Sequence, residues 1–168
     1  MRKTVKLGIL ISFAIIISLF ESMMPIPIPV PGVKLGLSNI VLLVTLLLFG
    51  LKEGFIVAIS KSVLMVLVSG RLGALPYSLA GTMFAMISMY LSYKYLSKWL
   101  SLIGISEIGS LFFNLGQLLV ASFILNNMRI LLYLPAMALM GVVTGYIVGI
   151  TSKFVLERLK KGDINVRW

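Results

Sequence analysis

The sequence contains no cysteine and no histidine, and only five of its 168 residues are acidic. Without cysteine the chain has no disulfides, no thiolate nucleophile and no cysteine ligands for zinc. Without histidine it has no imidazole base or imidazole metal ligand. The acidic residues are far apart in the sequence, at Glu21, Glu53, Glu107, Glu157 and Asp163. Because magnesium-dependent diphosphate chemistry normally needs clustered carboxylates, we expect no enzyme activity and no cofactor.

Polar side chains are also too scarce to cover a soluble domain of this length. Charged residues make up 12% of the chain and hydrophobic residues 60%, with a mean hydropathy of +1.09. In soluble domains roughly 25% of the residues are charged and roughly 45–50% are apolar. The phosphate loop G-x-x-x-x-G-K-[ST] is absent, which excludes ATP hydrolysis by that route. The net charge of +10 is spread between apolar runs, so no nucleic-acid partner is expected. We predict an all-α integral membrane bundle, with the lipid bilayer as its surroundings.

Apolar runs long enough to cross a hydrocarbon core, roughly 17–25 residues, occur about six times. The predicted helices are Val5–Met24, Leu35–Leu51, Glu53–Ser69, Leu75–Leu96, Ile105–Leu125 and Ile130–Phe154. They form a single transmembrane domain, 1–168, with a basic tail from about residue 153. The break around Gly50 can place the short second and third helices in one tight hairpin. The basic start of the chain also resembles a secretory signal, but no cleavage site follows, so we expect the first helix to be retained.

The basic residues favour one orientation in the membrane. Six spans put both termini on the same side, and that side then carries eleven Lys and Arg residues. These are Arg2, Lys3, Lys6, Lys52, Lys94, Lys98, Lys153, Arg158, Lys160, Lys161 and Arg167. The opposite side carries only Lys34, Arg71 and Arg129. Because cytoplasmic loops are enriched in Lys and Arg, we predict a multi-pass plasma membrane protein with both termini in the cytoplasm.

Small and polar residues recur on one face of each of the last three predicted helices. The three sets are Ser78, Gly81, Ala85, Ser88 and Ser92; then Glu107, Ser110, Asn114, Gln117 and Ala121; then Gly141, Gly145 and Gly149. Spacings of three and four keep each set on one helical face, which should turn away from lipid. Helix packing accounts for most of these residues. Asn114 and Gln117 fit either a hydrogen-bond clamp between helices or the lining of a solute cavity.

Further polar residues collect at the predicted outer ends of the helices. The segment Pro25–Gly32 alternates proline with apolar residues and is expected to be a stiff, extended cover. Lys34 and Asn39 follow it, at the start of a helix whose free N–H groups favour an anion. We expect a polar or anionic solute to enter here; a solvated charge ring unrelated to any solute is the alternative.

Lys61 lies about eight residues inside the third predicted span. A buried cation there needs a carboxylate, a ring of carbonyls or an anionic ligand, or must extend to the interface. The candidate solute contacts are therefore Lys34, Asn39, Lys61, Arg71, Asn114 and Gln117, with Glu21 as a charge partner.

Several motifs extend over almost the whole chain. They are Glu21-x-x-x-Pro25, Pro31-Gly32-Val33-Lys34-Leu35-Gly36-Leu37-Ser38-Asn39-Ile40, Phe49-Gly50-x-Lys52-Glu53, Ser78-Leu79-Ala80-Gly81, Asn114-x-x-Gln117-Leu118 and Tyr133-Leu134-Pro135. Together they resemble the family heptaprenyl diphosphate synthase component I, also called Gx transporters. Phe113 departs from the family pattern, in which a histidine is expected before the asparagine.

That family is similar to the S-components of energy-coupling factor transporters, six-helix proteins that capture vitamin-like solutes from outside. The resemblance implies a transmembrane scaffold and ATPase subunits as partners. It also implies docking through small residues of the first helix, for which Gly8, Ser12, Ala14 and Ser18 are the counterparts. The family label implies a soluble prenyl synthase partner. Two functions remain open: a solute-binding transport component, and a non-catalytic membrane subunit for prenyl diphosphate or quinone synthesis or a flavin-linked redox assembly.

Overall fold

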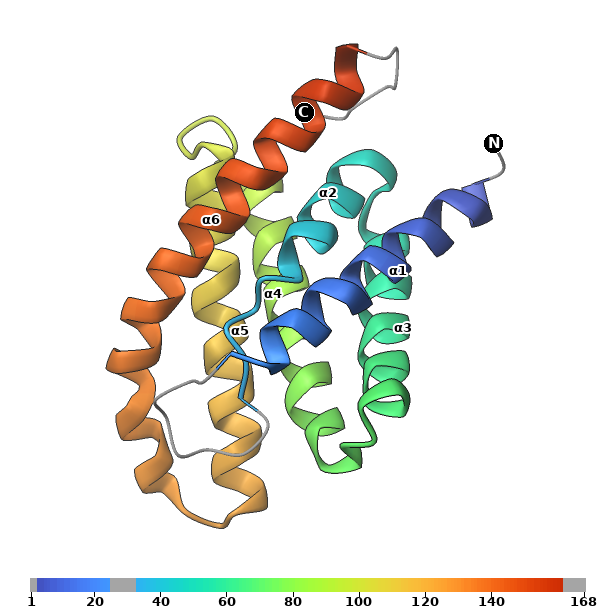
Figure 1. The fold of residues 1–168 in the computed structure, drawn as a ribbon. Coiled ribbons are helices and arrows are strands. Elements are labelled where there is room, and N and C mark those ends of the chain that lie inside the picture. The colour runs from blue at the N-terminus through green and yellow to red at the C-terminus, as the bar shows by residue number, and fades with distance from the viewer. Residues whose placement is uncertain (1–2, 25–32, 162–168) are drawn as a thin grey trace.

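The computed structural model describes residues 3–24 and 33–161, which form an α-helical bundle without strands (Figure 1). Its α-helices are α1 (Lys3–Ser22), α2 (Asn39–Phe49), α3 (Leu51–Ser69), α4 (Leu75–Leu96), α5 (Leu102–Ile124) and α6 (Leu134–Lys161). The 3-10 helices η1 (Leu72–Ala74) and η2 (Met128–Tyr133) precede α4 and α6. The predicted all-α bundle is confirmed. The predicted cover Pro25–Gly32 and the last part of the basic tail, 162–168, lie outside the described residues.

Only α4 has the predicted bounds, and two of the differences in the other helices have identifiable reasons. The second helix begins at Asn39 instead of Leu35, because Gly36 has a φ of +92° and interrupts the helical backbone. The last helix continues to Lys161 instead of ending at Phe154, and its last turn is basic, which suits the negative end of the helix dipole. The tail predicted from residue 153 is thus helical as far as Lys161.

Within residues 3–24 and 33–161, four stretches are long and apolar enough to cross a membrane. They are Lys3–Ser22, Leu72–Leu96, Leu102–Ile124 and Met128–Lys161. With 11 residues, α2 is only about 16 Å long, and α3 contains three charged residues. A single residue, Gly50, separates α2 from α3, so these two helices form the tight hairpin that the break in the sequence suggested.

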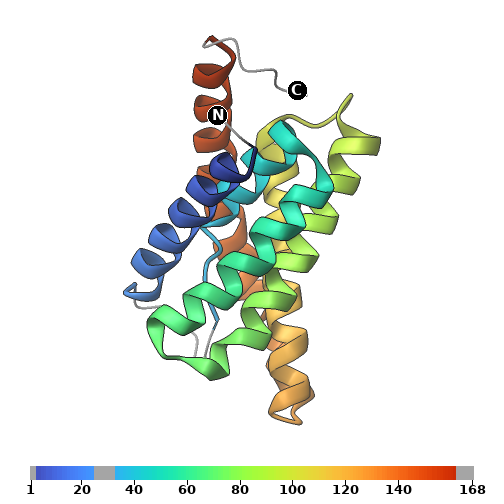
Figure 2. The same ribbon diagram turned by 90° about the vertical axis from the view of Figure 1, so that its right-hand side faces the viewer.

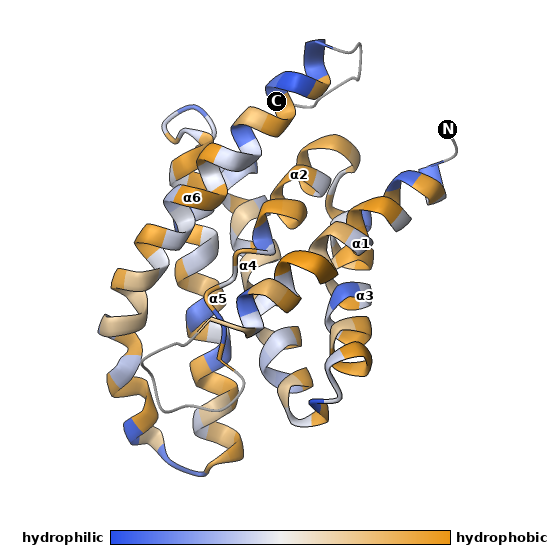
Figure 3. Ribbon diagram, viewed as in Figure 1, coloured by the Kyte–Doolittle hydropathy of each residue, from blue (hydrophilic) through white to orange (hydrophobic). Residues whose placement is uncertain are grey.

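Many large apolar side chains of the bundle are exposed, and many of its buried side chains are polar. Orange, the colour of hydrophobic residues, predominates along the helices in Figure 3. Phe13, Ile16 and Phe20 project from α1 with 56–60% of their surface exposed. By contrast, Ser62 and Gln117 are completely buried. A large apolar surface in water marks an interaction site or an aggregation hazard, whereas in lipid it is the expected exterior. The chain is therefore a helical membrane protein.

Small residues let α5 pack tightly between α4 and α6. The inward faces predicted for these three helices are confirmed: every member is buried except Glu107, which is half-buried. A Cβ atom on Gly145 would lie 2.6 Å from the Cα of Glu107, so the two backbones nearly touch. The hydroxyl of Ser106 on α5 donates to the carbonyl of Gly145 at 2.6 Å. Close backbone approach and interhelical hydrogen bonds are the usual means of helix association in lipid.

Most of the described basic residues lie at one end of the bundle. The start of α1, the α2–α3 junction and the end of α6 are together at this end (Figures 1 and 2). An ion pair between Lys3 of α1 and Glu53 of α3 links two of these helices. The end of α1 and the α3–α4 and α5–α6 connections lie toward the opposite end. We call the first the basic end and the second the pocket end.

Candidate functional site

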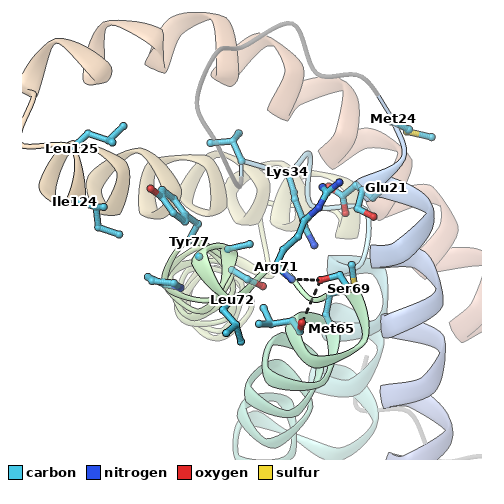
Figure 4. A pocket seen from close by; sticks show the side chains of 17 residues that line it. Glu21, Met24, Lys34, Met65, Ser69, Arg71, Leu72, Tyr77, Ile124 and Leu125 are labelled. Atoms are coloured by element: carbon cyan, nitrogen blue, oxygen red, sulfur yellow. Dashed lines mark hydrogen bonds between the residues drawn. The ribbon is translucent and has the colours of Figure 1, made fainter.

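A pocket of about 770 Å³ opens at the pocket end of the bundle (Figure 4). Its walls come from the end of α1, the segment before α2, the end of α3, the α3–α4 connection, the start of α4 and the end of α5. Sites for small molecules typically occupy roughly 300–1,000 Å³, so this pocket has room for a whole ligand.

One wall of the pocket is charged. Glu21, Lys34 and Arg71 line it, and Lys34 interacts electrostatically with both of the others. Arg71 follows Gly70, whose left-handed conformation (φ +68°) ends α3 and turns the chain toward α4. Burial lowers the pKa of Lys34; the Glu21 carboxylate opposes this effect and the Arg71 guanidinium adds to it. A bound anion would compensate both the burial of Lys34 and its repulsion from Arg71.

The opposite wall of the pocket is apolar. Tyr77 at the start of α4 and Ile124 and Leu125 at the end of α5 form most of it, and Figure 4 shows them on the side away from Glu21. Leu72 in the α3–α4 connection and Pro76 in the first turn of α4 also line the pocket. The pocket therefore has one side that holds its charged residues, together with Met24 and Met65, and one apolar side without charge.

Two hydrogen bonds hold Lys34 at its place in the charged wall. The side-chain oxygen of Gln117 accepts from the backbone N–H of Lys34 at 3.0 Å, and a carboxylate oxygen of Glu21 accepts from that of Gly36. A Cβ on Gly36 would be 2.9 Å from both the Asn39 amide nitrogen and the Phe113 ring. Phe113 thus packs tightly under this segment.

Lys61 lies behind the charged wall instead of lining it. Only 2% of its surface is exposed, and its ammonium group donates to the hydroxyl of Ser38. Its favourable electrostatic partner is Glu21, which is 1% exposed, while Lys34 opposes its charge. Its hydrogen-bond partner is thus a hydroxyl, and the Glu21 carboxylate favours its charge through space.

The residues predicted for the site fall into three groups. Lys34 and Arg71 line the pocket together with Glu21; Asn39, Lys61 and Gln117 are buried and do not line it. The amide of Asn114 donates to the backbone oxygen of Met137 on α6 at 2.7 Å, so Asn114 links two helices away from the pocket. The exposed Arg129 does not line it either.

The apolar wall was not predicted. In a chain this hydrophobic, Tyr77, Ile124 and Leu125 give the same sequence signal as residues that face lipid. Ser78 was assigned to a packing face and also lines the pocket. Its hydroxyl donates to that of Ser62 on α3 at 3.1 Å.

The fold and the pocket together identify the class of protein: a helical membrane protein with a site of ligand size between the ends of its helices. The family described as heptaprenyl diphosphate synthase component I matches residues 10–155 of this chain. The chain belongs to that family, as the motifs predicted. No curated protein and no solved structure matches the sequence or the fold.

Proposed function

We propose that the protein is a membrane transport component that binds a small anionic solute in the pocket at its outer side. The observation that carries this proposal is the pocket itself, which is large enough for a ligand and presents Lys34 and Arg71 on one wall. Two neighbouring cations repel each other, and the burial of Lys34 adds to the cost. An anionic ligand relieves both effects.

The distribution of charge supports an outward-facing pocket. The described basic residues concentrate at the basic end, and positive residues are enriched on the cytoplasmic side of membrane proteins. With the basic end in the cytoplasm, the pocket end faces outward, and a solute reaches the pocket without crossing the bilayer.

This orientation can be tested because the natural chain has no cysteine. A cysteine at Met128, which is 76% exposed in the α5–α6 connection, should react with an impermeant maleimide added to intact cells. A cysteine at the exposed Ser97, after α4, should react only once the membrane is opened. The reverse labelling pattern would place the pocket in the cytoplasm and exclude solute capture from outside.

Binding without catalysis fits the placement of the acidic residues. Glu21 lies at the pocket end, while Glu53 pairs with Lys3 at the basic end. Within residues 3–24 and 33–161, no three acidic, histidine or cysteine side chains come together to hold a metal ion. A transport component of this kind depends on partner subunits for energy, and a transmembrane scaffold with ATPase subunits would provide it.

The family name favours a second candidate, a non-catalytic membrane subunit of a prenyl diphosphate synthase. In that case the basic end would hold a soluble synthase at the membrane. Lys153, Arg158 and Lys161 on α6 offer an exposed cationic surface for it. The pocket would then need no soluble ligand.

A ligand screen separates the two candidates. The purified protein in dodecyl maltoside should show a raised melting temperature with at least one member of a panel of vitamins, flavins, prenyl diphosphates and inorganic anions. Arg71→Gln should weaken that ligand about tenfold, as expected for a lost hydrogen bond to a charged group. Arg129→Gln removes an equal charge outside the pocket and should have little effect. If no ligand raises the melting temperature while a prenyl synthase co-purifies, the synthase candidate replaces the transport candidate.

A further inference from the structure

The pocket is divided into a charged side and an apolar side, and this division restricts the kind of anion that it can hold. Figure 4 shows Glu21 and Arg71 on one side and Tyr77, Ile124 and Leu125 on the other. A small inorganic anion would occupy the charged side and leave the apolar wall in contact with water. A ligand that covers both sides needs an anionic head and an apolar body.

The charges around the pocket also indicate how negative the head should be. Glu21 and Lys61 are both almost completely buried, and Lys61 is the strongest cationic partner of Glu21. A carboxylate and an ammonium group cancel each other in net charge. Two lining cations, Lys34 and Arg71, remain to be neutralised. A head with two negative charges would neutralise both of them.

We infer that the pocket binds a soluble single-chain amphiphile whose head carries two negative charges, as in a phosphate monoester or a dicarboxylate. This inference rests on the proposed function and specifies its ligand class. The head lies between Lys34 and Arg71, whose charged donors suit phosphate or carboxylate oxygens. The apolar body lies along Tyr77 and Ile124. Burial of that body contributes affinity in proportion to the apolar area removed from water.

A matched ligand series tests the head and the body separately. Hexyl phosphate at pH 8 carries nearly two negative charges, because the second pKa of a phosphate monoester is about 6. Hexyl sulfate has the same chain with one charge, and inorganic phosphate is the head without a chain. By calorimetry in dodecyl maltoside, hexyl phosphate should bind at least about tenfold more tightly than either of the others.

Two variants test whether the charged wall recognises the head of the ligand and the apolar wall its body. Arg71→Gln should remove most of the preference for hexyl phosphate over hexyl sulfate. Ile124→Ser, at a side chain that is 49% exposed, should weaken hexyl phosphate severalfold and leave the affinity for inorganic phosphate unchanged. Dioleoyl phosphatidate at equal concentration should not displace hexyl phosphate, because the pocket lies among connections at the end of the bundle.

The outcomes distinguish this inference from the function on which it rests. If none of the three probes binds and the wider panel is also inactive, anion binding itself fails. Equal affinities for the three probes would overturn the amphiphile and leave anion binding intact. Displacement by phosphatidate would show that the ligand is a membrane lipid and would overturn the assignment to a soluble amphiphile.

Discussion

Replacement of Lys61 by methionine is expected to destabilise the protein by about 3–5 kcal/mol, the usual cost of leaving a buried charge without its partner. The ammonium group lies beneath the pocket, hydrogen-bonded to Ser38 and close enough to interact with Glu21. Glu21 is 1% exposed, and one of its carboxylate oxygens has no hydrogen-bond partner in the described part of the chain even with Lys61 in place. Loss of Lys61 removes the strongest cationic partner of this buried carboxylate. Methionine keeps a similar volume, so the change tests the charge and not the packing.

The second half of this test is the double variant Glu21→Gln/Lys61→Met. Glutamine can still accept the hydrogen bond from Gly36, and the double variant contains no unpaired buried charge. We expect it to regain most of the stability lost in Lys61→Met, as measured by thermal unfolding in detergent. Additive losses in the double variant would mean that Glu21 and Lys61 are not coupled.

The exposed Lys153 provides the control for this pair. It lies 4.0 Å from Glu157 one turn along α6, and both side chains are about half exposed. Such surface pairs contribute about 0–1 kcal/mol, so Lys153→Met should leave the melting temperature nearly unchanged. A loss as large as that of Lys61→Met would show that burial is not the cause.

The helical faces were the part of this structure that the sequence determined best. Repeats of small and polar residues at three- and four-residue spacing placed Ser78, Ser110 and Gly145 in the interior, where they lie. This pattern is local, because it depends only on the geometry of one helix surrounded by lipid. The residue at which α2 begins could not be predicted from such a local pattern. It depends on Gly36, which has a positive φ. The N–H of Gly36 donates to Glu21 of α1, and Gly36 packs closely against Phe113 of α5.

The site was harder to predict, because its members come together only in the folded chain. The depth of Lys61 indicated that it needed a partner, but Glu21 is 40 positions earlier and belongs to another helix. Asn114 and Gln117 share a helical face but have different hydrogen-bond partners. Asn114 donates to a backbone oxygen of α6, and Gln117 accepts from the backbone N–H of Lys34. Which neighbour each amide meets is set by the packing of whole helices, and periodicity does not contain that information.

Introduction of a single methyl group at Gly145 is expected to destabilise the bundle by about 2–3 kcal/mol. The new Cβ would lie 2.6 Å from the Cα and 3.1 Å from the backbone nitrogen of Glu107, and backbone atoms cannot rotate away. Relief would require α6 to move away from α5. That movement would weaken the hydrogen bond from Ser106 to the carbonyl of Gly145.

Gly8→Ala is the matched control, because Gly8 also lies inside a helix and a Cβ there would have no neighbour within 4 Å. Both changes gain the same intrinsic helix propensity, about 0.8–1 kcal/mol. The difference between their unfolding free energies therefore measures the helix contact alone. We expect Gly8→Ala to be neutral or stabilising and Gly145→Ala to lower the melting temperature in detergent. If the two variants behave alike, α5 and α6 are not in backbone contact, and the close packing of small residues does not hold the bundle together.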